Sequence, residues 1–204
     1  LDANTTASNN VGIGYFALSA NTTGANNTAS GYQSLYTNTT GSYNTANGMY
    51  ALRYNTTASY NTATGYHSLY NNTTGANNTA NGYQSLYSNT TASYNTASGR
   101  GALFSNTTGA NNTASGGSSL YYNTTGANNT ALGQAAGDNI TTGSSNIIIG
   151  YNVDAPSATA SNQLNIGNWI KGVDGNIGIG VTPEAWASGY KVLQTGFDAS
   201  FGGN

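Results

Sequence analysis

Residues 21–37 read NTTGANNTASGYQSLYT, and this 17-residue unit decides the fold because the chain repeats it almost without interruption. The Asn-Thr-Thr opening recurs eight times from Asn4 to Asn123, with a constant 17-residue spacing. A glycine recurs with the same 17-residue spacing from Gly14 to Gly167. So short and regular a period is typical of a solenoid, in which each repeat forms one coil that packs on the next.

Two segments of the repeat have the pattern of short strands. Residues 27–31 and residues 32–36 each alternate in side-chain character, and corners rich in Gly and Asn separate them. This pattern favours strands and turns, whereas Thr, Asn and Gly are poor helix formers. We therefore expect an all-β protein, a parallel β-solenoid or β-roll of 17-residue coils with two short strands per coil in two closely spaced sheets. Asn side chains repeated at one register are expected to bond in ladders along the stack.

A leucine occupies the same place in successive coils, and between Asn21 and Ala131 no other Leu, Ile or Val occurs. We expect this column to be buried, either inside each coil or along an axis shared with other chains. Because one leucine per coil fills only a narrow interior, we also expect a homotrimeric fibre that buries Leu and Tyr side chains between chains. The predicted structural ladder consists of Leu35, Leu52, Leu69, Leu86, Leu103 and Leu120.

The composition argues against several other classes of protein. Leu, Ile, Val and Phe account for only 29 of the 204 residues, and charged residues make up 5%, against roughly 25% in a typical soluble domain. The 4 Lys and Arg residues are too few to neutralise a nucleic-acid backbone. No run of about 18 apolar residues exists to span a membrane. We expect neither nucleic-acid binding nor membrane insertion.

The residues of the array offer little chemistry for catalysis. The sequence has no Cys, and no Asp or Glu occurs between Ala3 and Gly137, so thiolates and paired carboxylates are absent from the array. Asp138, Asp154 and the later acids lack the spacing of a calcium-binding loop and are expected to be solvated. We therefore expect no catalytic residue, no cofactor and no metal site.

The residue pattern of the repeat becomes degenerate toward the end of the chain. Residues 1–139 are expected to form a regular shaft, residues 140–181 to continue it as degenerate and more apolar repeats, and residues 182–204 to form a cap or connector. Within the middle part the interval from Gly167 to Gly180 is shorter than the regular period, which predicts one shortened coil. In the last part, residues 183–186 have the pattern of a helical turn and residues 190–194 that of a strand.

The first and last repeats carry larger apolar residues than the central ones. The two positions that flank the repeated Ala are mostly Thr, Ser and Asn, but near the ends they become Val11, Ile13, Ile147 and Ile149. Terminal coils of a solenoid need extra cohesion. We expect these side chains to supply it by filling the interior more densely.

Tyrosines recur in rows, and the 16 Tyr residues allow two interpretations. Stacked rings stabilise a ladder by roughly 0.5–1.5 kcal/mol per pair. Amphipathic rings beside amide side chains also bind sugars, because the ring stacks on the pyranose while the amide bonds the hydroxyl groups. His67 lies at the outward-facing place of Gln33 and has no acid or Cys near it in sequence. The candidate saccharide contacts are Tyr32, Tyr66, Tyr83, Gln33, His67 and Gln84.

The Asn-Thr-Thr motif also allows more than one role. It is suited to a turn and is at the same time an N-glycosylation sequon, as are the Asn-Asn-Thr sequences that begin at Asn26, Asn77, Asn111 and Asn128. Its Thr pairs, repeated at coil spacing, also suit an ice-binding array, although bulky variation at the adjacent corner disfavours that role. We favour the turn.

Residues 78–86, NTANGYQSL, resemble the head repeats of trimeric autotransporter adhesins. Those heads are left-handed parallel β-rolls, with three chains side by side, but their usual repeat is shorter than the 17-residue unit of this chain. The array is more similar to bacteriophage tail-fibre proteins, in which such repeats precede a segment like residues 175–183, GNIGIGVTP. In that family the segment commonly comes before a C-terminal intramolecular chaperone, which trimerises the fibre and then cleaves itself off.

The resemblance implies a structural, non-enzymatic fibre of a phage tail that belongs to the virion and attaches to the host-cell surface. Its implied partners are other copies of the chain, other tail or fibre proteins, and a host glycan or receptor. A bacterial surface adhesin or an extracellular structural filament is the alternative, because similar repeats occur in those proteins as well.

Overall fold

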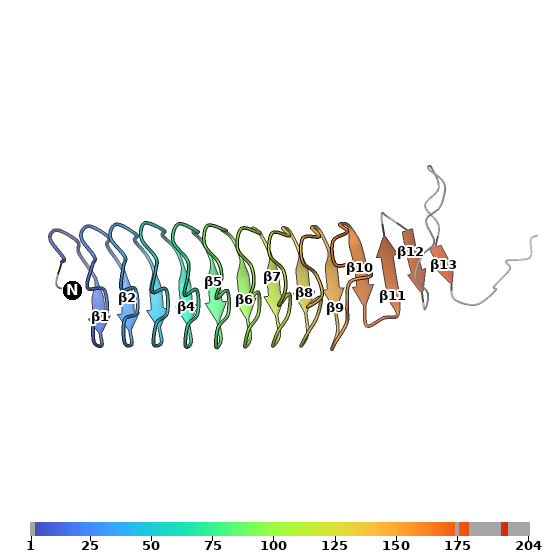
Figure 1. The fold of residues 1–204 in the computed structure, drawn as a ribbon, viewed down its shortest axis with the longest axis horizontal. Coiled ribbons are helices and arrows are strands. Elements are labelled where there is room, and N and C mark those ends of the chain that lie inside the picture. The colour runs from blue at the N-terminus through green and yellow to red at the C-terminus, as the bar shows by residue number, and fades with distance from the viewer. Residues whose placement is uncertain (1–2, 174–175, 180–192, 196–204) are drawn as a thin grey trace, which may run out of the picture.

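The chain winds into one elongated solenoid in the computed structural model, which describes residues 3–173, 176–179 and 193–195 (Figure 1). The described residues contain strands and turns but no helix, so the prediction of an all-β solenoid with 17-residue coils is confirmed. Each regular coil contributes one strand of three residues. These strands are β1 (Val11–Ile13), β2 (Thr28–Ser30), β3 (Thr45–Asn47), β4 (Thr62–Thr64), β5 (Thr79–Asn81), β6 (Thr96–Ser98), β7 (Thr113–Ser115), β8 (Thr130–Leu132) and β9 (Ile147–Ile149).

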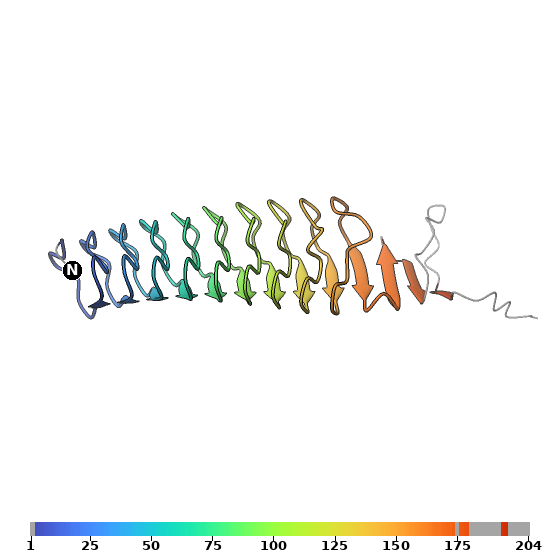
Figure 2. The same ribbon diagram turned by 60° about the horizontal axis from the view of Figure 1, so that its bottom comes forward.

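All the described strands join one sheet in sequence order, and the sheet forms a single face of the solenoid (Figure 2). From β1 to β10 (Gln163–Ile166) neighbouring strands are parallel, and each residue pairs with the residue 17 positions further on, as Thr45 does with Thr62. The strands β11 (Ile170–Val173) and β12 (Asn176–Ile179) are antiparallel to their preceding neighbours. The prediction of a shortened coil before Gly180 is therefore wrong, because the chain reverses direction at β11 and again at β12.

The sheet ends with β13 (Leu193–Thr195), which pairs parallel to β12. This strand overlaps the end of the strand predicted at residues 190–194. The helical turn predicted at residues 183–186 lies outside the described residues.

The prediction of a second strand in each coil, and with it of two sheets, is also wrong for the described residues. Residues 32–36 form a tight turn, in which Gln33 and Leu35 have left-handed φ angles of 51° and 48°. Their backbone N–H groups donate to the coils on either side, Gln33 to Tyr15 O at 2.9 Å and Leu35 to Ala51 O at 3.0 Å. A left-handed non-glycine residue is costly on its own, so these bonds to both neighbours hold the conformation. Each coil thus has one strand packed on one turn segment.

The repeated glycine is required by close contact between coils. Gly82 has a φ angle of +139°, and a Cβ atom placed there would lie 2.5 Å from the carbonyl oxygen of Gly99 in the next coil. Both the backbone conformation and the contact favour glycine. The same situation recurs from Gly14 to Gly133. The 17-residue glycine period therefore records the points at which successive backbones touch.

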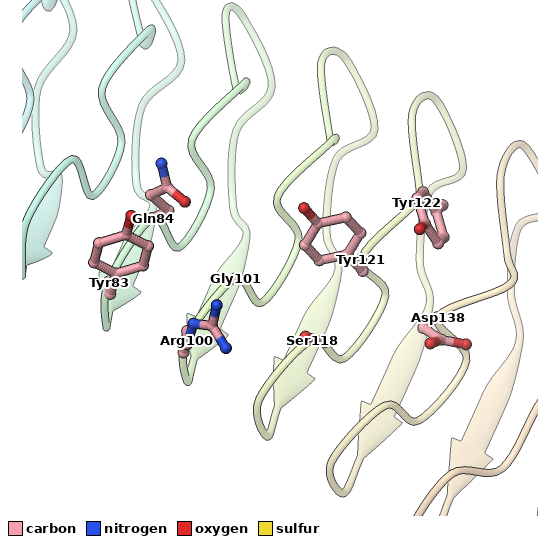
Figure 3. Close-up of a pocket in the computed structure, with 8 residues that line it drawn as sticks. All are labelled: Tyr83, Gln84, Arg100, Gly101, Ser118, Tyr121, Tyr122 and Asp138. Carbon is pink, nitrogen blue, oxygen red and sulfur yellow. The ribbon is translucent and has the colours of Figure 1, made fainter.

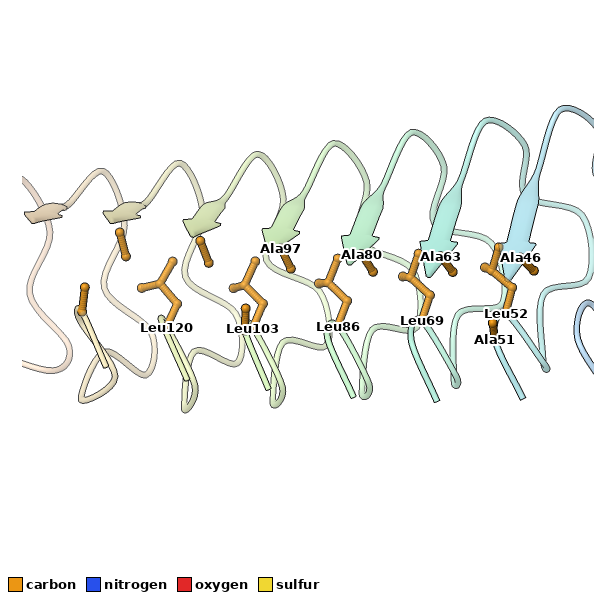
Figure 4. Packing of buried hydrophobic residues seen from close by; sticks show 14 of the residues in the cluster. Ala46, Ala51, Leu52, Ala63, Leu69, Ala80, Leu86, Ala97, Leu103 and Leu120 are labelled. Carbon is orange, nitrogen blue, oxygen red and sulfur yellow. The ribbon is translucent and has the colours of Figure 1, made fainter. Parts of the chain in front are cut away.

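The leucine column is fully buried inside each coil, where it packs against the inward-facing alanines of the sheet (Figure 4). The predicted ladder from Leu35 to Leu120 is confirmed as a buried column, and a single chain is enough to bury it. The expected denser filling of the terminal coils is wrong for Val11 and Ile13, which are 45% and 62% exposed on the outer face of β1. In β9 only the central residue, Ile148, is buried completely.

Two asparagine ladders run through the interior, as the repeated Asn residues predicted. In the first ladder, Asn55 Nδ2 donates to Asn38 Oδ1 at 2.8 Å and to Ala58 O in its own coil at 2.9 Å. In the second, the backbone N–H of Asn61 donates to Asn44 Oδ1 at 3.0 Å, while Asn61 Nδ2 donates to a carbonyl of the next coil. Buried amides satisfied in this way replace the apolar core that the composition lacks.

Both ladders end where the residue at the ladder position changes. Ile140 stands where the first ladder would continue after Asn123, and it is fully buried. Gln163 closes the second ladder, because its backbone N–H donates to Asn146 Oδ1 at 2.9 Å while its longer side chain reaches Ser157 N and Ala160 O. The change of side chain coincides with the reversal of the strands that follows.

Candidate functional site: an aromatic strip and a cleft

Aromatic side chains on the turn segments of the coils form one continuous surface, which we call the aromatic strip. Neighbouring rings stay in contact along its whole length; for example, Tyr70 stacks on Tyr87 at 5.3 Å between ring centroids and Phe104 stacks on Tyr121 at 4.9 Å. The strip comprises Tyr15, Phe16, Tyr32, Tyr36, Tyr50, Tyr54, Tyr66, His67, Tyr70, Tyr83, Tyr87, Phe104, Tyr121 and Tyr122. Half of these rings are exposed and the other half are half-buried, and an aromatic surface of this kind is typical of an interaction site.

The six predicted saccharide contacts all lie along the strip region. Tyr32, Tyr66 and Tyr83 are exposed, whereas the paired Gln33, His67 and Gln84 are half-buried. Tyr66 and Tyr83 stack at 5.5 Å, but Tyr32 lies two coils away from Tyr66. The structure therefore arranges these residues along an extended surface rather than around one point. A separate pair, Tyr43 and Tyr60, stacks at 5.0 Å outside the strip.

Arg53 lies among the rings of the strip, at the repeat position that Tyr36 and Tyr70 hold in the neighbouring coils. Its guanidinium lies 5.0 Å from the ring centroids of both Tyr50 and Tyr54, and it donates a hydrogen bond to the Tyr70 hydroxyl at 2.8 Å. Rings arranged in this way stabilise a cation. Partial burial, together with the positive charge of Arg53, lowers the pKa of the neighbouring His67. The strip can therefore carry charge in its centre without an acidic partner.

A cleft opens along the strip where the bulky outer residues become small. The position held by Gln84 in one coil is Gly101 and then Ser118 in the next two coils. The resulting cleft has a volume of about 290 Å³, and Figure 3 shows Tyr83 and Gln84 at one end and Asp138 at the other. Its lining residues are Tyr83, Gln84, Arg100, Gly101, Ser118, Tyr121, Tyr122 and Asp138. Only Tyr83 and Gln84 were predicted from sequence, and the shift from bulky to small residues was the available signal for the rest.

The charged groups of the cleft have different surroundings. Burial, followed by a hydrogen bond with Asp154, raises the pKa of Asp138. The contact between these two carboxyl groups is much closer than the ~5–10 Å at which glycosidases hold their catalytic pair. The Arg100 guanidinium lies 6.0 Å from the Tyr83 ring centroid. Across the described part of the chain, no group of three or more His, Cys, Asp or Glu residues is placed to hold a metal ion.

The two sets of glycosylation sequons differ in exposure. The Asn of the regular Asn-Thr-Thr motifs from Asn21 to Asn123 is fully buried in the first ladder, so the folded coil does not present it to a modifying enzyme. In the second set, Asn77, Asn111 and Asn128 are exposed. The structural role of the first set agrees with the turn interpretation of the motif.

Comparisons with protein-family models, with curated proteins and with solved structures give no match for this chain. Among the described residues, no helix is long and apolar enough to cross a membrane. The fold and the aromatic strip, with its cleft, therefore carry the functional argument.

Proposed function

We propose that this chain is the shaft of a phage tail fibre and attaches the virion to a host-cell surface without catalysis. The observation that carries the proposal is the aromatic strip, a continuous row of exposed and half-buried rings on a rod of near-identical coils. A rod displays one surface many times over, and repeated weak contacts add up to strong attachment. The likeness of the repeat to tail-fibre proteins supports the viral origin.

The proposed partners are two further copies of the chain and a glycan or receptor on the host. The leucine column gives no reason for a trimer, because each chain buries its own leucines. The separate pair Tyr43 and Tyr60 remains a reason, since both rings lie outside the strip and stay exposed on a single chain. Light scattering on the purified chain tests this point: a mass of three chains supports the trimer, and a mass of one chain contradicts it.

Electron microscopy of the native source with an antibody against the shaft tests the function. Labelling of short fibres on virions would support the proposal. Labelling of long filaments or of a cell surface would instead favour a bacterial surface adhesin or an extracellular filament, in which the same strip would serve adhesion. Binding of the purified chain to host cells, with loss of binding after substitution of strip tyrosines, tests attachment separately from origin.

A further inference from the structure

The cleft in the strip differs from the rest of the surface in shape and in charge. It runs across four successive coils, from Tyr83 to Asp138, which corresponds to roughly 14 Å at the usual strand spacing. Its volume of about 290 Å³ is close to the lower limit of small-molecule sites. A cleft of this length and volume suits a short, extended ligand.

Arg100 is the only cationic side chain that lines the cleft, and its binding capacity is unused. It is exposed and forms no hydrogen bond or ion pair with any described residue, so its contact is the Tyr83 ring at 6.0 Å. Arg53, by contrast, is bonded to Tyr70 and enclosed by rings. A guanidinium has five N–H donors in a planar fork that matches a carboxylate. The free fork of Arg100 therefore favours an anionic group.

The remaining walls of the cleft suit a sugar. Tyr121 is held by its stack with Phe104 at an interplanar angle of 3°, so it offers a fixed flat ring. Gln84, Ser118 and Asp138 add amide, hydroxyl and carboxyl groups that exchange hydrogen bonds with hydroxyl groups. The Asp138 carboxyl at the far end disfavours a second anionic group there. This distribution fits a ligand with one acidic end and many hydroxyls.

We propose that the cleft binds an acidic oligosaccharide, with its carboxylate on Arg100, a sugar ring on Tyr121 and its hydroxyl groups on Gln84 and Ser118. The inference rests on the proposed attachment function, for which it names a ligand class and a site. A neutral saccharide would leave the Arg100 fork without a partner. In the cleft a nucleic acid would meet a single cation, and the chain as a whole has a net charge of −2.

Calorimetric titration of the full chain with two probes that carry one carboxylate each, sialyllactose and an aldotriouronic acid, and with the neutral maltotriose and lactose tests the ligand class. We expect binding of at least one acidic probe and binding at least about tenfold weaker for both neutral probes, because the charged hydrogen bonds are missing. Equal binding of acidic and neutral probes would overturn the role of Arg100, and absence of binding by both acidic probes would overturn the proposal.

Three variants test the place of binding. Arg100→Gln removes the charge, and Ser118→Gln fills the cleft with the residue type that Gln33 and Gln84 show at this backbone position. Each should weaken binding of the acidic probe about tenfold or more. Lys171→Gln on β11 removes the same charge elsewhere and should leave the affinity unchanged.

Acidic-probe affinity that survives in both cleft variants would contradict the cleft as the site. It would leave the fibre function intact, because microscopy and cell attachment test that function independently. Circular dichroism of each variant checks that the solenoid remains folded, so that lost affinity is attributed to the cleft itself.

Discussion

The interior columns and the aromatic strip belong to the same coils but follow opposite rules. In the columns, the same residue type recurs in every regular coil, as leucine does from Leu18 to Leu120. On the strip, the position of Gln33 becomes Tyr50, His67, Gln84 and Gly101 in the following coils, all with similar left-handed φ angles. An interior side chain meets copies of itself above and below, so one shape fits, whereas an outer side chain meets solvent and can vary. Constancy in the interior columns therefore marks structure, and variation along the strip marks the surface available for recognition.

The strongest test of the comparison is a change at a glycine where successive coils touch. Gly82→Ala should destabilise the fold by about 4 kcal/mol or more, because its Cβ would overlap the Gly99 carbonyl and its φ angle of +139° disfavours alanine. Gly117→Ala, on the outer surface, is the matched control, since its Cβ would have no neighbour closer than 3.9 Å. Chemical denaturation measures both, and similar midpoints would contradict the close contact between coils.

The next largest effect is expected in the leucine column. Leu69→Ala should cost about 2–5 kcal/mol, because it removes a fully buried side chain and leaves a cavity. Leucine and alanine would both have to adopt the left-handed conformation of position 69, so the substitution changes the backbone strain little. Gln84→Ala, on the half-buried outer row, should change stability by only about 0.5 kcal/mol. If the two variants unfold alike, the leucine is not buried as described.

The asparagine ladder should tolerate substitution less well than its neighbours in sequence. Asn72→Ala removes the donor to Asn55 Oδ1 and Gly75 O, both at 2.9 Å, and the acceptor for Asn89 Nδ2. Leaving buried polar atoms unpaired should cost about 2–3 kcal/mol. The matched control is Asn71→Ala, one residue earlier and only half-buried, for which a change within about 0.5 kcal/mol is expected. Thermal unfolding of both variants decides whether the ladder bonds contribute to stability.

The smallest expected effect is a pH dependence on the strip. Burial, and then the charge of Arg53, lower the pKa of His67, so the folded state binds a proton less readily than the unfolded state. The contribution of His67 to the free energy of unfolding is constant above a pH of about 6.5. Below that value the free energy of unfolding falls as the pH drops toward the pKa of His67 in the folded state. His67→Gln, with a residue type found at the same position in other coils, should lose this dependence. Denaturation midpoints at several pH values measure the difference, and parallel curves for the two proteins would contradict the assignment.

The solenoid could be predicted from the sequence because the residues that make contacts between coils recur with its 17-residue period. The column of Leu69 and the ladder of Asn72 follow directly from repetition at one register. The turn at Gln33 and Leu35 could not be predicted in this way, because left-handed φ angles at such residues oppose their intrinsic preference and are imposed by bonds to both neighbouring coils. Alternation alone made this segment look like a strand.

The site was less accessible from the sequence than the fold. Rows of tyrosine indicated an aromatic surface, but contacts between rows, such as Tyr50 with Tyr70, depend on side-chain directions that a repeat pattern does not contain. The cleft arises because Gly101 and Ser118 have smaller side chains than Gln84 at the same repeat position, and no sequence motif marks such a change. Val11 and Ile13 flank the strand position that points inward in the other coils, so the alternation of a strand directs both outward, and the expectation that they fill the interior was wrong for this reason.

The stacking of each coil on the next also sets the length of the rod. Each 17-residue coil advances the chain by one strand spacing, roughly 4.8 Å, whereas the same segment in an α-helix would advance roughly 25 Å. Because each strand contacts only its immediate neighbours in the sheet, insertion or deletion of one whole 17-residue unit preserves every kind of contact. A duplicated or lost stretch of coding sequence would thus change the reach of the rod in small, equal steps. The same event would add or remove one row of outward-facing side chains.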